Sequence, residues 1–178
     1  IAHYVFSQML RWNKRIDHHI ELQKEKDWSP MGGDGELTNK TLLILGYGGI
    51  GKEVAKLGKA FGMQVIGIRR NPEACKFADQ VLTMERFEEF LPLTDFLVMA
   101  LPNSEETNNV INKDVLKKLN NLAMLINVGR GNAVNEEDLA DALNSSELAA
   151  AALDTTKQEP LDASSNLWTA KNLSLIHI

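Results

Sequence analysis

The sequence contains a single cysteine, Cys75, among its 178 residues. One cysteine cannot form a disulfide within the chain, so no disulfide framework supports the fold. A chain without disulfides is typical of the reducing cytoplasm, and we expect a cytoplasmic location. We interpret Cys75 as an ordinary small residue, with a reactive thiol as the alternative.

Long apolar runs are also absent. No run reaches the roughly 18 residues that a membrane-spanning helix needs, and no signal-peptide pattern opens the chain. The formal net charge of −5 and the pI near 5.4 argue against a general binder of nucleic acids or anionic membranes. We therefore expect neither a nucleic acid nor a membrane as a partner. The content of 44% apolar and 24% charged residues is ordinary for a globular protein.

What the chain does contain is three regions of different character. Residues 1–26 place apolar side chains at near-helical spacing and predict one amphipathic helix. Residues 27–39 are rich in Pro and Gly and predict a loop. Residues 40–178 alternate apolar runs with helical segments and predict the core of a single domain. Because the chain starts at Ile1, inside a helical pattern, we expect an internal piece of a longer protein.

The apolar runs predict buried strands at residues 41–46, 63–68, 95–101, 122–129 and 149–154. Each run is continuous rather than alternating, as expected for strands that are covered on both faces. Helical segments are predicted between them, at residues 50–61, 84–91, 112–119 and 135–145. Strand–helix alternation of this kind implies a parallel sheet with right-handed crossovers. The predicted fold class is α/β, with a doubly wound parallel sheet.

The first apolar run leads into the sequence GYGGIG, at residues 46–51, and then into a helical segment. Gly46 permits the tight turn, Gly48 lets the backbone approach a pyrophosphate, and Gly51 lets helix and strand pack closely. Amide groups at the helix start would then face the phosphate oxygens. A tight turn without any ligand is the alternative. The strand–turn–helix context favours a Rossmann dinucleotide-binding site.

The second run ends in GIRRNPEA, where NAD-preferring proteins have an acidic residue for the ribose 2′-hydroxyl. Arg69 and Arg70 stand there instead. They remove the carboxylate that would repel a 2′-phosphate, and a guanidinium can pair with one. The sequence therefore favours NADP over NAD, with two solvated surface charges as the alternative. Glu73 begins the next segment, which makes it a poor substitute for the missing acid.

Three charged residues follow the last two runs. Arg130 lies in a Gly-flanked turn, and Asp154 and Glu159 come at and after the end of the next run. Ligands bind at this carboxyl edge of an α/β sheet. A cation and two acids there could orient a substrate and tune a proton donor. A surface ion-pair network is the alternative.

Four segments resemble the D-isomer-specific 2-hydroxyacid dehydrogenases: GYGGIG, ALPNSEET, NVGRGNAVNEEDLADAL and AAALDTTKQEPL. The resemblance covers nearly the whole chain. An Arg-Gly motif and then an Asp…Glu-Pro motif, both after a GxGxxG, form a highly specific combination. The resemblance implies the NAD(P)-binding domain of such an enzyme, with NAD or NADP as cofactor. It also implies hydride transfer between that cofactor and a small 2-oxo or 2-hydroxy acid.

The resemblance assigns roles to individual residues. Arg130 matches the arginine that binds the 2-oxo acid and polarises its carbonyl, since a guanidinium can hold a carboxylate by two parallel hydrogen bonds. Glu159 matches the acid that keeps the catalytic histidine protonated, and His177 is the candidate for that histidine. Asp154 matches a residue near the nicotinamide carboxamide. The implied cofactor-binding residues are Gly46, Tyr47, Gly48, Gly49, Ile50, Gly51, Arg69, Arg70, Leu101, Pro102, Val128, Gly129, Arg130 and Asp154.

The C-terminus departs from the family pattern. The family reads Asn, a few apolar residues and then Thr-Pro-His, whereas this chain reads NLSLIHI, with Ile176 where proline would stand. A misplaced His177 is therefore the alternative to a catalytic one. His18 and His19 are consecutive on a predicted helix and point to different faces, so no metal site is expected.

The family's substrate lobe is built mostly from sequence that precedes the cofactor domain, and almost all of that lobe is absent here. The resemblance places residues 1–26 in the interdomain and dimer-forming region, and an unpaired apolar helix face favours self-association into a homodimer. It also implies that this chain alone binds nucleotide better than it turns over substrate.

Functions from three classes remain open. The first is reduction of a small 2-oxo acid, of the glyoxylate or hydroxypyruvate type, with a leaning towards NADP. The second is a nucleotide-regulated protein-binding module, since the C-terminal-binding-protein corepressors share the family fold. The third is a structural remnant without a ligand. Turnover by the full-length protein would support the first, and nucleotide-dependent dimerisation without turnover the second.

Overall fold

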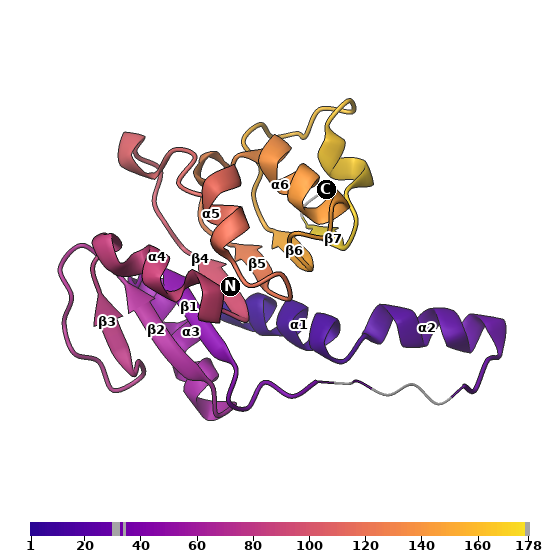
Figure 1. The fold of residues 1–178 in the computed structure, drawn as a ribbon, viewed down its shortest axis with the longest axis horizontal. Coiled ribbons are helices and arrows are strands. Elements are labelled where there is room, and N and C mark those ends of the chain that lie inside the picture. Colours follow the sequence, from indigo (N-terminus) through magenta and orange to yellow (C-terminus); the bar gives the residue numbers. More distant parts are fainter. Residues whose placement is uncertain (30–32, 34, 177–178) are drawn as a thin grey trace.

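A computed structural model describes residues 1–29, 33 and 35–176, and its centre is a seven-stranded sheet (Figure 1). Neighbouring strands all run parallel, in the order β3-β2-β1-β4-β5-β6-β7. This arrangement confirms the predicted doubly wound α/β fold. The strands are β1 (Thr41–Leu45), β2 (Gln64–Ile68), β3 (Gln80–Leu82), β4 (Phe96–Met99), β5 (Met124–Asn127), β6 (Ala150–Leu153) and β7 (Leu173–Leu175).

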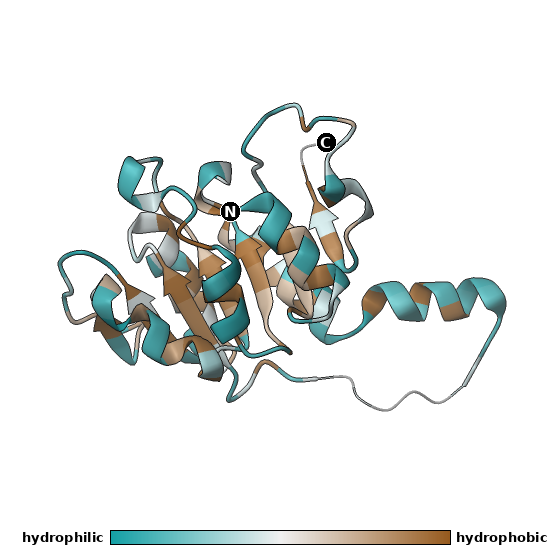
Figure 2. Cartoon of the chain, turned by 45° about the horizontal axis from the view of Figure 1, so that its top comes forward, coloured by the Kyte–Doolittle hydropathy of each residue, from teal (hydrophilic) through white to brown (hydrophobic). Residues whose placement is uncertain are grey.

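Helices cover both faces of the sheet. Among the described residues they are α1 (Ala2–Asn13), α2 (Ile16–Glu25), α3 (Gly49–Ala60), α4 (Phe87–Phe90), α5 (Lys113–Lys118) and α6 (Glu136–Asn144). Side chains of α1 and α3 pack in one core, and side chains of α4, α5 and α6 pack in the other. Figure 2 shows the apolar strands in brown at the centre, with mostly teal helices around them.

Successive residues of one strand supply the two cores in turn. Leu42 and Ile44 of β1 enter the core under α1 and α3, whereas Leu43 and Leu45 enter the core under α4–α6. All four side chains are at most 1% exposed. Burial on both faces explains why the strands are continuous apolar runs in the sequence, and all five predicted runs contain strands.

The sequence does not predict the two edge strands, β3 and β7. Each has only three residues, of which those in β7 are half-buried and Gln80 of β3 is exposed. Edge strands of this length lack the apolar run by which a buried strand is recognised. The helix predicted at residues 84–91 is also less regular than expected. A 3₁₀ turn at Met84–Arg86 precedes α4, and another at Leu91–Leu93 follows it.

The prediction of one helix over residues 1–26 is wrong, because the structure has two helices there. Arg15 adopts a left-handed conformation with φ of 51°, which interrupts the helical backbone between α1 and α2. Val5, Phe6 and Met9 of α1 are buried against the sheet. In α2 no residue is buried, and Ile16 and Ile20 are each 43% exposed. The apolar pattern continues across the break, so periodicity alone could not locate it.

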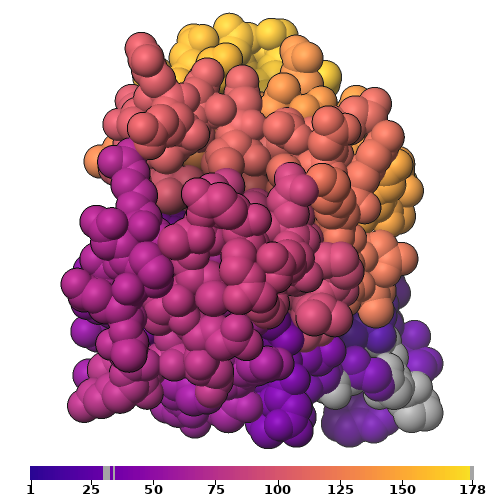
Figure 3. All heavy atoms as spheres, turned by 60° about the vertical axis from the view of Figure 1, so that its left-hand side comes forward, coloured from indigo at the N-terminus to yellow at the C-terminus, as the bar shows by residue number. Residues whose placement is uncertain are grey.

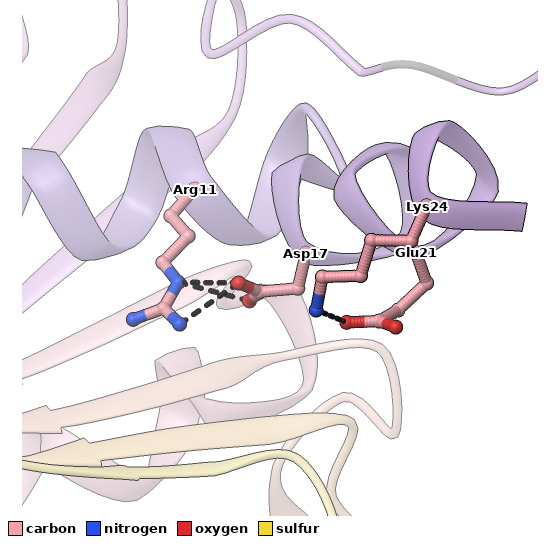
Figure 4. Close-up of polar contacts among 4 residues, drawn as sticks. All are labelled: Arg11, Asp17, Glu21 and Lys24. Carbon is pink, nitrogen blue, oxygen red and sulfur yellow. Dashed lines mark hydrogen bonds and ion pairs between the residues drawn. The ribbon is translucent and has the colours of Figure 1, made fainter. Parts of the chain in front are cut away.

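Polar contacts join the two helices across this break (Figure 4). Nη2 of Arg11 lies 2.8 Å from Oδ1 of Asp17, and Nε of Arg11 lies 2.9 Å from Oδ2. Within α2, Nζ of Lys24 lies 2.7 Å from Oε1 of Glu21. α2 extends away from the body of the domain (Figure 1). Through the described part of the chain, no helix combines the length and the apolar content that crossing a bilayer requires.

Asp79 holds the start of β2, the strand that leads to the two arginines. Its carboxylate accepts hydrogen bonds from the Val65 amide at 2.7 Å and from Nζ of Lys59 at 2.8 Å. Burial acts to raise the pKa of Asp79, but these two hydrogen bonds outweigh it and hold the pKa below its ordinary value. A carboxyl group with a lowered pKa in the folded state stabilises the fold above its unfolded pKa, near 3.9.

We expect Asp79→Asn to lower the free energy of unfolding at pH 7 by about 0.5–1 kcal/mol, a modest value because the side chain is 39% exposed. As the pH falls through the folded-state pKa of Asp79, the wild-type protein loses this contribution, and the two unfolding free energies converge. Urea unfolding followed by circular dichroism between pH 7 and pH 3 measures the difference. A difference that stays constant to the acid end would contradict the assignment.

Candidate functional site

The loops at the carboxyl edge of the sheet lie in close backbone contact. Gly46, after β1, has φ of +101°, and a Cβ atom there would lie 2.6 Å from the carbonyl oxygen of Ala100, after β4. Gly129, after β5, approaches the same segment, since its Cβ would lie 2.7 Å from the oxygen of Leu101. The structure therefore brings Gly46, Leu101 and Gly129 together, as predicted for residues of one cofactor site.

The GYGGIG turn has two kinds of glycine. At Gly51 a Cβ would lie 2.6 Å from the oxygen of Gly46, so this position is closed by backbone. At Gly48 and Gly49 no atom lies within 4 Å of an added Cβ, so both positions face open space. Gly48 is the N-cap of α3 and provides no side-chain hydrogen bond to it. The first N–H groups of a helix have no partner within the helix, and here they adjoin that open space. A pyrophosphate fits this arrangement.

Tyr47, a predicted cofactor-binding residue, turns its side chain into the core. The residue is 1% exposed, and a Cβ at Gly67 would lie 2.5 Å from its ring. Contact between Tyr47 and a dinucleotide is therefore limited to the backbone. Its hydroxyl is buried, and burial raises its pKa. The hydroxyl faces the half-buried Cys75 and lowers the pKa of that thiol.

Arg69 and Arg70 follow β2 directly, and each meets a carboxylate. Nη1 of Arg69 lies 3.4 Å from Oε2 of Glu73, and the Arg69 side chain is 29% exposed. Nη2 of Arg70 pairs with Oε2 of Glu106, and the Arg70 side chain is 75% exposed. Glu73, expected to be a poor substitute for the missing acid, is thus the partner of Arg69, and Glu106 was not predicted at this site. Separation along the chain hides Glu106, since it lies 36 residues from its partner.

Asn127 shapes the turn that carries Arg130. It is fully buried at the end of β5, where its Nδ2 donates to the oxygen of Arg130 at 3.0 Å and its Oδ1 accepts from the amide of Gly129 at 3.0 Å. These bonds satisfy a buried amide and bend the chain so that the Arg130 side chain is exposed at the edge. Asn127 is not among the predicted site residues, although a lone Asn near the end of an apolar run is a signal that could have identified it.

The loop after β6 lies against this turn. A Cβ at Gly131 would be only 2.0 Å from the carbonyl carbon of Thr156, so only glycine fits there. Glu159 is exposed and its Oε1 accepts from the Thr156 amide at 3.1 Å. Within the part of the chain that the structure describes, neither Arg130 nor Glu159 forms an ion pair. The ion-pair network considered as an alternative does not include them. His177 lies outside the described residues.

Asp154 joins the site to α1. Its amide donates to the oxygen of Asn127 at 2.9 Å, which fixes the residue at the end of β6. Burial raises the pKa of Tyr4, in α1, to about 12. The negative charge of Asp154 adds to this increase. Tyr4 therefore stays neutral at physiological pH. No residue of the first helix was predicted to lie at this edge.

Two buried oxygens near these loops have no hydrogen-bond partner among the described residues. They are Oδ1 of Asn132, in the turn after Arg130, and Oγ1 of Thr155, next to Asp154. Buried polar atoms are normally satisfied, so such atoms mark places where a ligand or water can bind. The described residues contain no group of three or more His, Cys, Asp or Glu that could hold a metal ion.

Comparison with known proteins agrees with this geometry. Residues 6–177 match the model of the family described as D-isomer specific 2-hydroxyacid dehydrogenase, NAD binding domain. The chain belongs to this family. The predicted family, fold and cofactor class are thereby confirmed, and the open turn at Gly48 belongs to an NAD(P)-binding domain. The roles of the individual site residues stay predictions.

Relatives and solved structures extend the comparison. The chain is 35% identical to a glyoxylate/hydroxypyruvate reductase A from Citrobacter koseri, over 93% of this chain and 53% of the relative. A family protein from Aeromonas salmonicida has a TM-score of 0.93 and 38% identity, over 98% of this chain and 56% of that one. An NADPH-dependent glyoxylate/hydroxypyruvate reductase from Sinorhizobium meliloti, solved with NADP and sulfate, has a TM-score of 0.89 and 28% identity, over 98% and 56%. The chain thus spans about half the length of the proteins it matches.

The two kinds of glycine make a matched pair of variants. We expect Gly48→Ala to keep the free energy of unfolding within about 0.5 kcal/mol, because its φ of −97° suits alanine and the added methyl meets open space. The methyl would occupy the phosphate position and weaken dinucleotide binding by about tenfold or more. Gly51→Ala should instead lower stability by about 1–3 kcal/mol through its clash with backbone.

Chemical denaturation and nicotinamide fluorescence titration separate the two effects. If the Gly48→Ala variant folds normally and binds dinucleotide as tightly as the wild type, the dinucleotide phosphate does not bind next to Gly48.

Proposed function

We propose that the protein containing this chain reduces a small 2-oxo acid, of the glyoxylate or hydroxypyruvate type, with NADPH. The observation that carries the proposal is the exposed Arg130, which forms no ion pair within the described residues. Its turn contacts the Ala100–Leu101 segment, which also contacts Gly46 of the GYGGIG site. The names of the reductases from Citrobacter koseri and Sinorhizobium meliloti support the substrate class.

Each residue has a distinct task in this proposal. The cofactor, when bound, supplies the hydride. Arg130 binds the substrate carboxylate by two parallel hydrogen bonds and polarises the carbonyl, because its guanidinium remains charged. Glu159 lies on the adjoining loop and would favour the protonated form of the acid, His177, which gives its proton to the substrate oxygen. Asp154 would orient the carboxamide of the nicotinamide.

Preference for NADP rests on the end of β2. Arg69 and Arg70 offer two guanidinium groups at the place where a carboxylate would exclude a 2′-phosphate. Arg70 in particular is three-quarters exposed, so its head group is accessible to a ligand. NADP in the Sinorhizobium meliloti structure supports the same preference.

We also propose a homodimer, supported by the exposed apolar side chains of the N-terminal region. Ile16 and Ile20 of α2 are 43% exposed, and Trp28 is 98% exposed. A helix with an uncovered apolar face gains free energy when a second copy covers it. The corepressor alternative finds no support among the relatives named above, which are reductases.

The activity test requires the full-length protein that contains this chain. We expect it to oxidise NADPH when glyoxylate or hydroxypyruvate is added, as absorbance at 340 nm would show. Arg130→Ala should lower kcat/KM by about a hundredfold or more, and Arg130→Lys should recover only a small part, because lysine cannot form the bidentate pair. Tight NADPH binding without turnover of any 2-oxo acid would overturn the enzymatic proposal.

The cofactor preference is tested by titration of this chain with NADPH and NADH. We expect tighter binding of NADPH, and we expect Arg69→Ala combined with Arg70→Ala to remove the difference by weakening only NADPH, by about tenfold or more. Arg86→Ala is the control for loss of an ion-paired arginine, since Arg86, at the end of the 3₁₀ turn Met84–Arg86, pairs with Glu89 of α4 at 2.6 Å. Equal or tighter NADH binding by the wild type would assign the two arginines to the solvated surface.

A further inference from the structure

The two arginines at the end of β2 are already neutralised by carboxylates before any nucleotide binds. Glu73 is four residues from Arg69 and belongs to the same loop. Glu106 belongs to a different loop, which follows β4, and pairs with Arg70 across the ends of the strands. Figure 3 shows the magenta part of the chain in contact with the salmon part on this face of the molecule. The Arg70–Glu106 pair therefore joins the two segments that flank the end of β1.

Arg70 can exchange the Glu106 carboxylate for another anion at little cost. The side chains of Arg70 and Glu106 are 75% and 73% exposed, so both remain largely hydrated and their separation requires little desolvation. Arg69 is less exposed, at 29%, and its distance to Glu73 is longer, at 3.4 Å. Arg69 is therefore the more buried of the two arginines and has the longer ion pair, whereas Arg70 is the more accessible to a competing anion.

A 2′-phosphate is a stronger partner for Arg70 than a carboxylate. A phosphate monoester carries about −1.5 to −2 charges near neutral pH and three acceptor oxygens, whereas a carboxylate carries one charge. When NADPH binds, its 2′-phosphate can replace the Glu106 carboxylate as the ionic partner of Arg70. The phosphate then lies beside the released carboxylate of Glu106. The binding free energy of NADPH is reduced by the loss of the ion pair and by this repulsion. NADH, which has a free 2′-hydroxyl, incurs neither effect.

We propose that Glu106 is a specificity-determining residue, which limits the preference for NADP by competing with the 2′-phosphate for Arg70. This inference rests on the proposed use of Arg69 and Arg70 for a 2′-phosphate. Arg69 and Arg70 create the preference for NADP, and Glu106 reduces it. Because Glu106 lies on the loop after β4, the segments that follow β2 and β4 are joined by this ion pair in the free protein. In this proposal the ion pair breaks when NADP binds.

The chain contains a matched control at the neighbouring position. Glu105 carries the same charge in the same 3₁₀ turn, Glu105–Thr107, and forms no ion pair among the described residues. Glu106→Gln and Glu105→Gln therefore change the net charge equally and differ only in the loss of the contact with Arg70. Long-range effects of the charge change are common to both variants and are screened over about 10 Å at 0.1 M salt.

The experiment is titration of the wild-type chain and the two variants with NADPH and NADH, by nicotinamide fluorescence, at low and high salt. For Glu106→Gln we expect the Kd of NADPH to fall by about three- to fivefold and the Kd of NADH to stay within about 1.5-fold. Glu105→Gln should shift neither Kd by more than about 1.5-fold, and the gain from Glu106→Gln should shrink at about 0.5 M salt.

The outcomes separate this inference from the function on which it rests. If Arg70→Ala weakens NADPH binding but Glu106→Gln leaves it unchanged or weakens it, Glu106 is not a competitor, and the cofactor preference stands without it. If Arg70→Ala has no effect on NADPH, the 2′-phosphate site itself is wrong and the inference falls with it. If Glu105→Gln tightens NADPH as much as Glu106→Gln does, general charge explains the effect and the inference is overturned.

Discussion

The nucleotide site depends on one close backbone contact, between Gly46 and Ala100. At Gly46 a side chain would lie 2.6 Å from the oxygen of Ala100, and the backbone there has a positive φ, so only glycine meets both demands. This contact brings the end of β1 against the end of β4. The strand order reverses at these strands, and in open α/β sheets a ligand crevice forms at such a point. The predicted cofactor-binding residues come from the loops that surround this contact.

Charge is distributed unequally along the site. At the end of β2, Arg69 and Arg70 are paired with Glu73 and Glu106, so the free protein has little net charge where a 2′-phosphate would bind. At the opposite side, around Arg130, the described structure leaves a cation without an ionic partner on a turn that Asn127 holds from within the core. The first arrangement allows exchange of ionic partners, whereas the second presents a charge in a defined direction to a ligand anion.

The parts of the structure that sequence reasoning missed share a physical cause. The break at Arg15 lies inside a continuous apolar pattern, and that pattern does not show that α1 buries residues whereas α2 buries none. The edge strands β3 and β7 are too short to show a pattern of their own. Glu106 and Tyr4 act on residues far along the chain, Arg70 and Asp154, and no local spacing connects such pairs.

The sequence by itself determined the doubly wound fold, the dinucleotide turn and the family, because each depends on local order: apolar runs buried on both faces, and glycines at the spacing of GYGGIG. Only the tertiary structure decided that Tyr47 faces the core rather than the cofactor, and that Glu106 reaches Arg70. The direction of a side chain and the pairing of distant charges depend on how the loops pack after the strands have assembled, and that packing is a property of the whole chain.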